Sequence, residues 1–393
     1  MNTLTEVLRN EELRRRLFPV AKSRAFFAHA GVTALPQPAC EALRWFADQA
    51  CEDQQEGPAV WMRVQRARKT AANLIGAKDS EIALLGPTAL GLNLVADGLS
   101  WQAGDEVICY QDDYPANVYP WIKLRARGVV VRFLQPGEPG KITWETLRKE
   151  LSPKTKLVAL ATANFISGYR IDAEGIGKKL HERGVLFCLD GIQTLGAFPL
   201  SVEHVDFLSA DSHKWLLGPL GAGIFYVKEE HFGRLRPALL GSWNVQSPNF
   251  IAQDTIEFYE GARRYEPGSL NVPGILAMQA SMEFLLEIGV NAVAARLLEL
   301  RRYLVPRLTA LGFDLYGMRD ISENECSGIL TFYFPKQCDR KGLMSRLQEK
   351  KISVSLRHNR AGEELFRVSP HFYNTEQELD QLVETCAEYA SGR

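Results

Sequence analysis

The sequence predicts an α/β fold, in which a large domain with a mainly parallel, seven-stranded sheet precedes a smaller α+β C-terminal domain. Apolar runs alternate with helical segments between residues 81 and 227. Such alternation implies right-handed crossovers and a sheet that is buried on both faces. Beyond residue 227 the alternation weakens. The chain has 393 residues, 46% of them apolar, which is enough for two domains with a sizeable core.

The segment before the sheet is predicted to be mainly helical. Residues 3–17 have the spacing of an amphipathic helix rich in Arg and Glu. A short strand at Phe26 runs into a turn, and Pro36 and Pro38 favour the start of the next helix. Residues 61–75 predict a further helix on the same grounds.

Short apolar runs bounded by turn residues predict the strands of the sheet. These strands are expected at Ile82–Leu85, Glu106–Cys109, Val129–Phe133, Lys156–Ala161, Val185–Leu189, Val205–Ala210 and Gly223–Val227. Ligands of open α/β sheets bind beyond the carboxyl ends of the strands. We therefore expect the functional residues in the segments that directly follow these runs.

Longer helices and fewer strands are predicted for the C-terminal part. Residues 275–311 read as long helices broken near Gly289, followed by strands at 328–334 and 352–356 and a closing helix at 376–390. We expect an N-terminal segment packed with the small domain, then the large domain, then the small domain, at residues 1–55, 56–272 and 273–393.

Composition argues against several classes of protein. The 46 basic and 47 acidic residues nearly cancel, so no basic field favours nucleic acid or an anionic membrane as a partner. No apolar run approaches the roughly 20 residues that span a bilayer, and the charged start does not resemble a signal peptide. Seven cysteines without a CxxC pair predict neither a disulfide framework nor a metal site. A cytoplasmic enzyme is the expectation.

Lys214 is the residue around which the predicted site is built. It follows the apolar run 205–210, and Asp190 ends the neighbouring run 185–189. A desolvated lysine has a lowered pKa and becomes an amine nucleophile. A lysine and an aspartate so placed suit pyridoxal 5′-phosphate, because the lysine forms a Schiff base and the carboxylate keeps the pyridine nitrogen protonated. The alternative is a solvated lysine at a strand end.

A turn that opens a helix after the first strand could bind the phosphate of such a cofactor. In the run Gly86–Asn93, Thr88 and Ala89 stand where free backbone N–H groups and the positive end of a helix dipole are expected. The glycine pattern at 218–223 precedes a strand, which is the wrong context for a dinucleotide fingerprint, so a dehydrogenase is not favoured.

The runs DGIQ at 190–193, SHKWLLGP at 212–219 and RVSPHFYNT at 367–375 resemble the class V aminotransferases of PLP fold type I. This family includes cysteine desulfurases, kynureninases and isopenicillin-N-epimerase-like enzymes. The resemblance implies a Schiff base at Lys214 and a cofactor ring held by Asp190. It also implies an aromatic ring stacked on the cofactor at Tyr114, oxygen contacts from Asn164 and Gln193, and a phosphate or cofactor contact from His213. A loop tyrosine packed on the core is the alternative for Tyr114.

The resemblance also implies a homodimer with shared active sites. The run 263–271 is similar to a family loop that reaches the partner's cofactor phosphate, with Ser269 in the place of a threonine. Trp243 could add an indole N–H donor to the cofactor site, or could be a packed tryptophan.

At the substrate end, the resemblance implies that Arg367 binds the α-carboxylate of a small amino acid, and the planar guanidinium suits that task. Arg357 is a second candidate. The desulfurase pattern has a cysteine on the loop before this arginine, whereas residues 355–367 contain none. We therefore expect an enzyme other than a standard persulfide-forming cysteine desulfurase.

The expected reaction starts with removal of the Cα proton of the substrate by Lys214. Transamination and C–S lyase-type β-elimination are favoured, and epimerisation or another PLP lyase reaction is the alternative. From a different class, a non-catalytic binding protein with this fold is possible, but such a protein would be free to lose Asp190 or Lys214.

Overall fold

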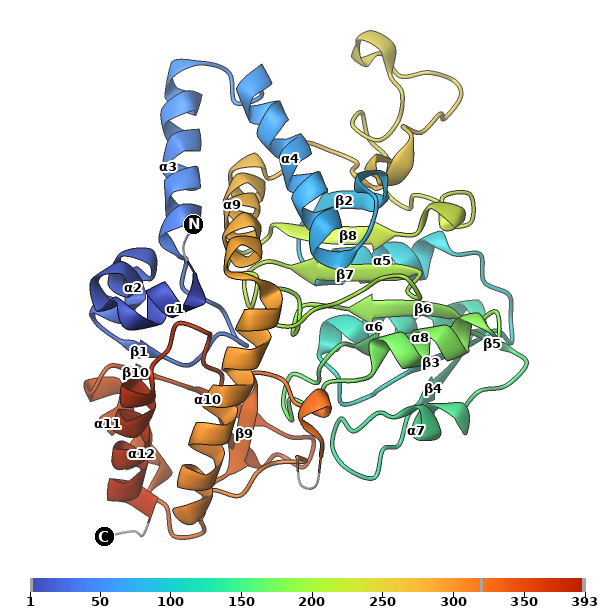
Figure 1. The fold of residues 1–393 in the computed structure, drawn as a ribbon. Helices are drawn as coiled ribbons and strands as arrows, with labels where there is room; N and C mark the ends of the chain where they lie inside the picture. The colour runs from blue at the N-terminus through green and yellow to red at the C-terminus, as the bar shows by residue number, and fades with distance from the viewer. Residues whose placement is uncertain (1–2, 319–320, 391–393) are drawn as a thin grey trace.

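A seven-stranded sheet forms the centre of the molecule (Figure 1). The structure is a computed structural model that describes residues 3–318 and 321–390. The strand order is β2-β8-β7-β6-β5-β3-β4, and β8 alone runs antiparallel to its neighbours. The strands are β2 Ile82–Leu85, β3 Glu106–Cys109, β4 Val130–Phe133, β5 Thr155–Ala161, β6 Leu186–Asp190, β7 Phe207–Asp211 and β8 Gly223–Val227. The predicted α/β fold and mainly parallel sheet are confirmed.

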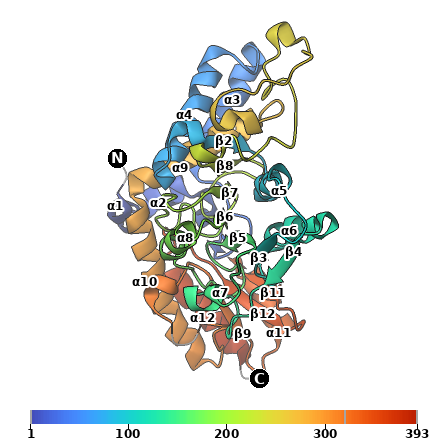
Figure 2. The ribbon, with the colours of Figure 1, turned by 90° about the vertical axis from the view of Figure 1, so that its right-hand side faces the viewer.

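Helices cover both faces of this sheet because neighbouring residues of each strand point to opposite faces. In β5, Val158 belongs to one buried cluster and Ala159 to the other. Helix α8 (Ala173–His181) packs on the first face, and helices α5 (Thr88–Gly98) and α6 (Tyr119–Lys123) pack on the second (Figure 2). The short helix α7 (Trp144–Arg148) precedes β5.

The N-terminal segment differs from the prediction of one helix over residues 3–17. It forms α1 (Leu4–Arg9) and α2 (Glu11–Leu17), which are separated at Asn10. The side-chain oxygen of Asn10 accepts a hydrogen bond from the backbone N–H of Leu13 at 3.0 Å. Asn10 therefore starts a new helix as an N-cap instead of continuing the first one. Helices α3 (Gln37–Glu52) and α4 (Pro58–Ile75) follow.

The C-terminal part contains the predicted long helices, α9 (Val272–Ile288) and α10 (Val290–Ala310), which are separated at Gly289. A three-stranded antiparallel sheet with the order β11-β12-β9 packs beneath them (Figure 1). Its strands are β9 Leu330–Tyr333, β11 Ser355–His358 and β12 Glu364–Val368, and the helices beside it are α11 Arg340–Glu349 and α12 Glu376–Ala390.

Two strand predictions in this part were wrong. The predicted strand at 352–356 is divided, because β10 (Ile352–Ser353) pairs with β1 (Ala25–Phe26) of the N-terminal segment. The following strand, β11, pairs instead with β12. We did not predict β12, although its residue Arg367 was a candidate site residue. Both differences depend on partners that are far away in the chain.

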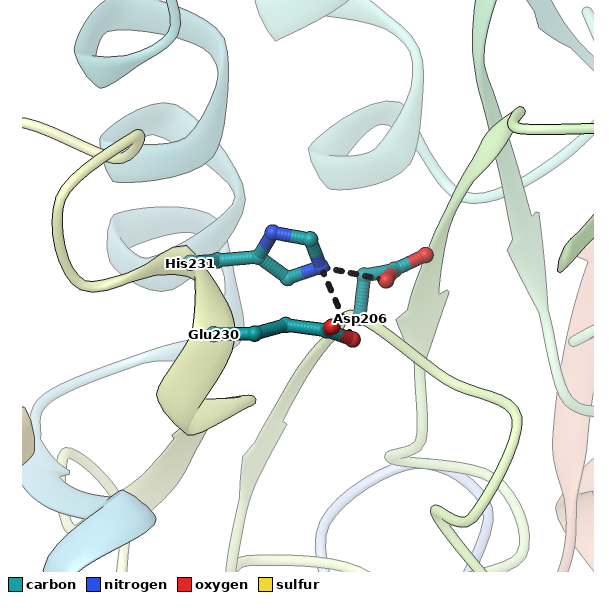
Figure 3. A group of neighbouring side chains, drawn as sticks. All are labelled: Asp206, Glu230 and His231. Atoms are coloured by element: carbon teal, nitrogen blue, oxygen red, sulfur yellow. Dashed lines mark hydrogen bonds and ion pairs between the residues drawn. The ribbon is translucent and has the colours of Figure 1, made fainter.

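A cluster of Asp206, Glu230 and His231 lies at the amino end of β7 (Figure 3). His231 Nε2 is 2.5 Å from Asp206 Oδ1, and the other oxygen of Asp206 accepts from the N–H of Phe187 at 2.6 Å. Because these atoms bond one another directly, the cluster is a structural ion pair at the edge opposite the predicted site. Among the helices of residues 3–318 and 321–390, none has the length and apolar character needed to cross a membrane.

Candidate active site

Lys214 and Asp190 meet at the carboxyl edge of the large sheet. Asp190 is the last residue of β6, and Lys214 comes shortly after the end of β7. The two strands are parallel neighbours, with Asp190 opposite Ser209. Both side chains therefore reach the same end of the sheet, where open α/β sheets bind ligands. Both residues are buried, with exposed fractions of 2% for Asp190 and 6% for Lys214.

The surroundings of Lys214 favour a neutral amine. Burial lowers the pKa of Lys214 to about 8, opposed by Asp190 and assisted by Arg367 and Arg357. Its Nζ lies 5.2 Å from the centre of the Tyr114 ring. A lysine with a pKa near 8 is present in part as the free amine at neutral pH, which is the form that reacts with an aldehyde.

Asp113 is a second buried carboxylate beside Asp190, and the sequence analysis missed it. One of its oxygens accepts from the backbone N–H of Ala161 at 3.1 Å, and Ala161 is the residue of β5 opposite Asp190. Burial and the charge of Asp190 raise the pKa of Asp113 to about 7. Burial also raises the pKa of Asp190, against the attraction of Lys214. A carboxylate at the end of β3, next to Tyr114, was the signal available in the sequence.

Arg367 and Arg357 face one space from the three-stranded sheet. Arg367 Nη1 donates to the carbonyl of Phe165 at 2.6 Å, whereas its buried Nε and Nη2 have no hydrogen-bond partner among the described residues. A Cβ atom at Gly31 would lie 3.6 Å from Arg367 Nη2 and 3.5 Å from Arg357 Nη2. The missing side chain of Gly31 keeps this space open. Unpaired guanidinium nitrogens there suit a carboxylate.

The start of α5 forms the predicted phosphate end of the site. Thr88 is the first residue of α5 and Ala89 the second, so their backbone N–H groups lack intrahelical acceptors. Thr88 Oγ1 accepts from the N–H of Asp211 at 2.9 Å, and its own proton can still be donated to a phosphate. His213 Nδ1 lies 3.0 Å from Asp211 Oδ2. Asp211 thus connects the helix start to the turn that carries Lys214.

Three other predicted residues have side-chain contacts within the protein. The ring of Tyr114 packs edge-on against Phe165, with 5.3 Å between the ring centres. Asn164 accepts from the N–H of Ser167 at 2.9 Å and donates to Asp112 O at 3.2 Å. Gln193 donates to Ala30 O at 3.3 Å and accepts from the Trp215 indole at 2.9 Å. Each amide has a second N–H, and contact with a cofactor oxygen stays a prediction.

Trp243 and Ser269 form a separate group. The ring of Trp243 stacks on Trp61 of α4, with 5.3 Å between the ring centres. Ser269 is exposed beside residues 54–56, which connect α3 and α4. Their described contacts are with this part of the molecule and not with Lys214. Their predicted cofactor contacts require a second copy of the chain.

Pyridoxal phosphate fits the residues gathered at the sheet edge. The buried amine of Lys214 can bond its aldehyde, Asp190 can hold its pyridine nitrogen, and the start of α5 can bind its phosphate. The unpaired nitrogens of Arg367 leave a place for a substrate carboxylate nearby. The fold and this arrangement of side chains define a pyridoxal-phosphate-dependent enzyme of fold type I.

Comparison with known proteins gives the family. The family model described as Aminotransferase class-V matches residues 26–382, and the chain belongs to this family. A probable cysteine desulfurase of Methanothermobacter thermautotrophicus is 27% identical over 98% of both chains. The isopenicillin N epimerase of Streptomyces clavuligerus is 28% identical over 89% of this chain and 91% of its own length.

Solved structures agree with the fold. The apo cysteine desulfurase of Thermococcus onnurineus NA1 has a TM-score of 0.89 and 24% identity, over 99% of this chain and 98% of its own. The cystine C–S lyase C-DES, in complex with its reaction product cysteine persulfide, has a TM-score of 0.83 and 22% identity, over 95% of this chain and 99% of its own.

The expectation that this enzyme is not a persulfide-forming cysteine desulfurase was wrong. It rested on the missing cysteine between residues 355 and 367, whereas relatives named cysteine desulfurases align with nearly the whole chain. In C-DES the persulfide is part of the cysteine product. A loop without cysteine therefore does not exclude persulfide chemistry, because the sulfur can leave on a molecule other than the enzyme.

Proposed function

We propose that the protein cleaves the C–S bond of a sulfur-containing amino acid, cysteine or its disulfide cystine. The observation that carries this proposal is the buried amine of Lys214 beside Asp190, next to an arginine with unpaired nitrogens. The names of the desulfurase relatives and of the C–S lyase neighbour support sulfur as the leaving atom.

Each residue has a separate task in this proposal. Arg367 binds the α-carboxylate with its unpaired Nε and Nη2, and Arg357 faces the same space. Bound pyridoxal phosphate supplies the electron sink for the charge that develops at Cα. The amine of Lys214, with a pKa of about 8, removes the Cα proton as general base and can return a proton afterwards. Asp190 keeps a negative charge at the pyridine end.

The test incubates the holoenzyme with L-cysteine, L-cystine and L-alanine, and measures sulfide, persulfide, pyruvate, ammonia and alanine. Release of sulfur from cysteine or cystine, with either alanine or pyruvate and ammonia, supports the proposal. Conversion of the cofactor to a stable amine form that a keto acid reverses, without sulfur release, would mean a transaminase and contradict it.

Two variants separate the site from the rest of the chain. Lys214→Ala should abolish sulfur release and covalent capture of the cofactor. Lys228→Ala is the control, since Lys228 Nζ pairs with Glu230 at 2.9 Å, away from the site. Equal activity of both variants would be incompatible with the role of Lys214.

Epimerisation is the second candidate, favoured by the similarity to isopenicillin N epimerase. An epimerase also removes the Cα proton, but it returns a proton to the opposite face without breaking a C–S bond. Exchange of the Cα proton with deuterated solvent and formation of the D-amino acid, with sulfur retained, would favour it over C–S cleavage.

We also propose that the protein works as a homodimer with shared active sites. The segment between β8 and α9, yellow in Figure 1, extends away from the sheet. It exposes apolar side chains at Leu240, Phe250 and Ile251, of which Phe250 is 80% exposed. Burial of these side chains against a second copy would be favourable. In such a dimer Ser269 and Trp243 would reach the partner's cofactor.

A further inference from the structure

Lys214 begins a tight turn that is held from several sides. The N–H of Leu217 donates to Lys214 O at 3.1 Å, and Leu217 has the left-handed φ of 58°. A non-glycine residue in that conformation persists only where the surrounding contacts enforce it. The turn from Lys214 to Leu217 therefore depends on its neighbours for its shape.

Trp215 is the residue through which the neighbours hold this turn. Its indole N–H donates to Gln193 Oε1 at 2.9 Å. Its backbone carbonyl contacts His371 Nε2 at 3.1 Å. Trp215 has no exposed surface, so water cannot replace His371 as the donor to this carbonyl.

The hydrogen bonds of His371 fix its tautomer. Its Nδ1 lies 2.9 Å from the backbone N–H of Phe372, which can only donate, so Nδ1 is the acceptor. The proton of the neutral ring is then on Nε2 and is donated to the carbonyl of Trp215. Complete burial lowers the pKa of His371 to about 4, which keeps the ring neutral at physiological pH.

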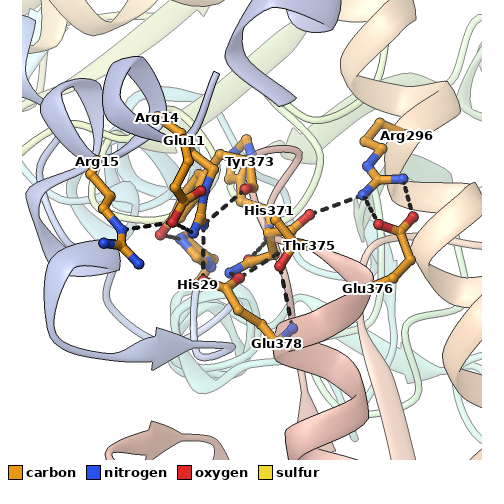
Figure 4. A network of polar contacts seen from close by, with 11 residues as sticks. Glu11, Arg14, Arg15, His29, Arg296, His371, Tyr373, Thr375, Glu376 and Glu378 are labelled. Atoms are coloured by element: carbon orange, nitrogen blue, oxygen red, sulfur yellow. Dashed lines mark hydrogen bonds and ion pairs between the residues drawn. The ribbon is translucent and has the colours of Figure 1, made fainter. Parts of the chain in front are cut away.

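His29 lies beside His371 and provides a comparison (Figure 4). The ring centres are 5.2 Å apart. His29 Nδ1 contacts Ser369 O at 3.1 Å and its Nε2 contacts the Tyr373 hydroxyl at 3.0 Å. The carbonyl can only accept, so the proton is on Nδ1. His29 is equally buried and neutral, but none of these hydrogen bonds reaches the Lys214 turn.

We propose that His371 is a positioning residue for Lys214, which holds the turn 214–217 in place by donating its Nε2 proton to the carbonyl of Trp215. The proposal rests on the proposed function only in taking Lys214 as the lysine that captures the cofactor. Without the donor, the buried carbonyl is left unsatisfied. The turn relaxes, water reaches the amine of Lys214, and the pKa of Lys214 rises toward its ordinary value.

The test measures the rate at which cofactor-free protein captures pyridoxal phosphate, from the visible absorption of the bound cofactor and from borohydride-trapped peptide, between pH 6.5 and 10. In the wild type the rate should rise with a midpoint near 8, the pKa of Lys214. In His371→Leu the midpoint should move up by about one pH unit, which makes capture about tenfold slower at neutral pH.

Two variants with matched side chains complete the design. In His371→Gln the amide nitrogen extends to the position of Nε2, so donation to Trp215 and the wild-type midpoint should return. His371→Asn is too short to reach, and its midpoint should resemble that of His371→Leu. In His29→Leu, which removes an equally buried imidazole, the midpoint should stay near 8. The other charges around Lys214, those of Asp190, Asp211, Arg357 and Arg367, are present in all variants.

A wild-type midpoint in His371→Leu, or the same shift in His29→Leu, would overturn the proposal. If His371→Leu does not fold, the comparison of His371→Gln with His371→Asn decides, and equal midpoints would overturn it. Failure of the wild type to capture the cofactor at Lys214 would instead contradict the proposed function.

Discussion

The arginine pair gives the site its demand for an anion. Burial and the neighbouring Arg357 lower the pKa of Arg367, so its charge is costly until a counter-ion arrives. Its Nη1 is occupied by the carbonyl of Phe165, which fixes the plane of the guanidinium and leaves Nε and Nη2 free. A carboxylate that bonds both nitrogens satisfies two buried donors and neutralises the charge in one step.

Arg367→Lys should therefore lower kcat/KM by about 100-fold, because a lysine offers no planar pair of donors and about 3 kcal/mol of charge-assisted hydrogen bonding is lost. Steady-state kinetics with L-cysteine measure this. Arg346→Lys is the control, since Arg346 on α11 pairs with Glu349 at 3.1 Å. An Arg367→Lys variant with the kinetics of the control would contradict the carboxylate role.

At the scale of elements, α5 packs on the sheet through Gly91. A Cβ at this position would lie 2.4 Å from Ser209 Oγ and 2.9 Å from Phe225 Cδ2. Ser209 Oγ also donates to the carbonyl of Thr88 at 3.0 Å. The distance between α5 and β7, and with it the place of Thr88, is therefore set by the absence of a side chain at Gly91.

Gly91→Val should displace the start of α5, lower stability by about 1–3 kcal/mol through overpacking, and weaken cofactor binding. Denaturant unfolding and titration with pyridoxal phosphate measure the two effects. Gly233→Ala is the control, because a Cβ there meets no atom within 4 Å. Cofactor affinity unchanged in a folded Gly91→Val protein would argue against the start of α5 as the phosphate site.

The run after β12 links stability to pH through His371. Its pKa of about 4 in the folded state lies below the ordinary 6.5. Above pH 6.5 both folded and unfolded states are neutral, and the full stability is present. As the pH falls, the unfolded state takes up the proton first, and about 3 kcal/mol is lost by pH 4.

His371→Gln cannot be protonated, so its free energy of unfolding should fall less between pH 6.5 and 4 than that of the wild type. Urea unfolding at several pH values measures the difference, which removes the contribution of carboxylates common to both proteins. Parallel pH profiles of the two proteins would show that His371 does not titrate as a buried neutral group.

The whole molecule brings three separate parts of the chain to one site. The large sheet provides Lys214 and Asp190, the three-stranded sheet provides Arg367, and the N-terminal segment provides Gly31. Arg360, next to β11, pairs with Asp112 after β3 and donates to Gln111 O at 2.9 Å, which ties the two sheets together across the site. In the proposed dimer, Ser269 of a second copy completes the phosphate end.

Mixing two inactive variants tests this sharing. Lys214→Ala and Ser269→Asp should each be inactive alone, but a mixed dimer has one site with both native residues. Mixed and refolded subunits should then regain about one quarter of the wild-type activity, because about half the dimers are mixed and each has one intact site.

If Ser269 acts within its own chain, no mixed dimer has an intact site and no activity returns. Ser201→Asp changes another exposed serine and should stay active. A monomer in solution would also refute the shared site.

Local sequence determined the strands, the long helices and the motif residues. The strands β2, β3 and β8 have the predicted bounds because short apolar runs between turn residues have few other ways to be buried. Asp190 and Lys214 were found because residues after parallel strands share one edge of the sheet. The family followed from runs that are continuous in the chain.

Only the tertiary structure decided the contacts between distant segments. Asp113 lies beside Asp190 because β3 and β6 both neighbour β5, an order that no local pattern contains. The division of the predicted strand at 352–356 depends on β1, more than 300 residues earlier. His371 donates to Trp215 only because the run after β12 packs against the Lys214 turn. Periodicity and capping act over a few residues, whereas these contacts follow from which elements become neighbours in the folded chain.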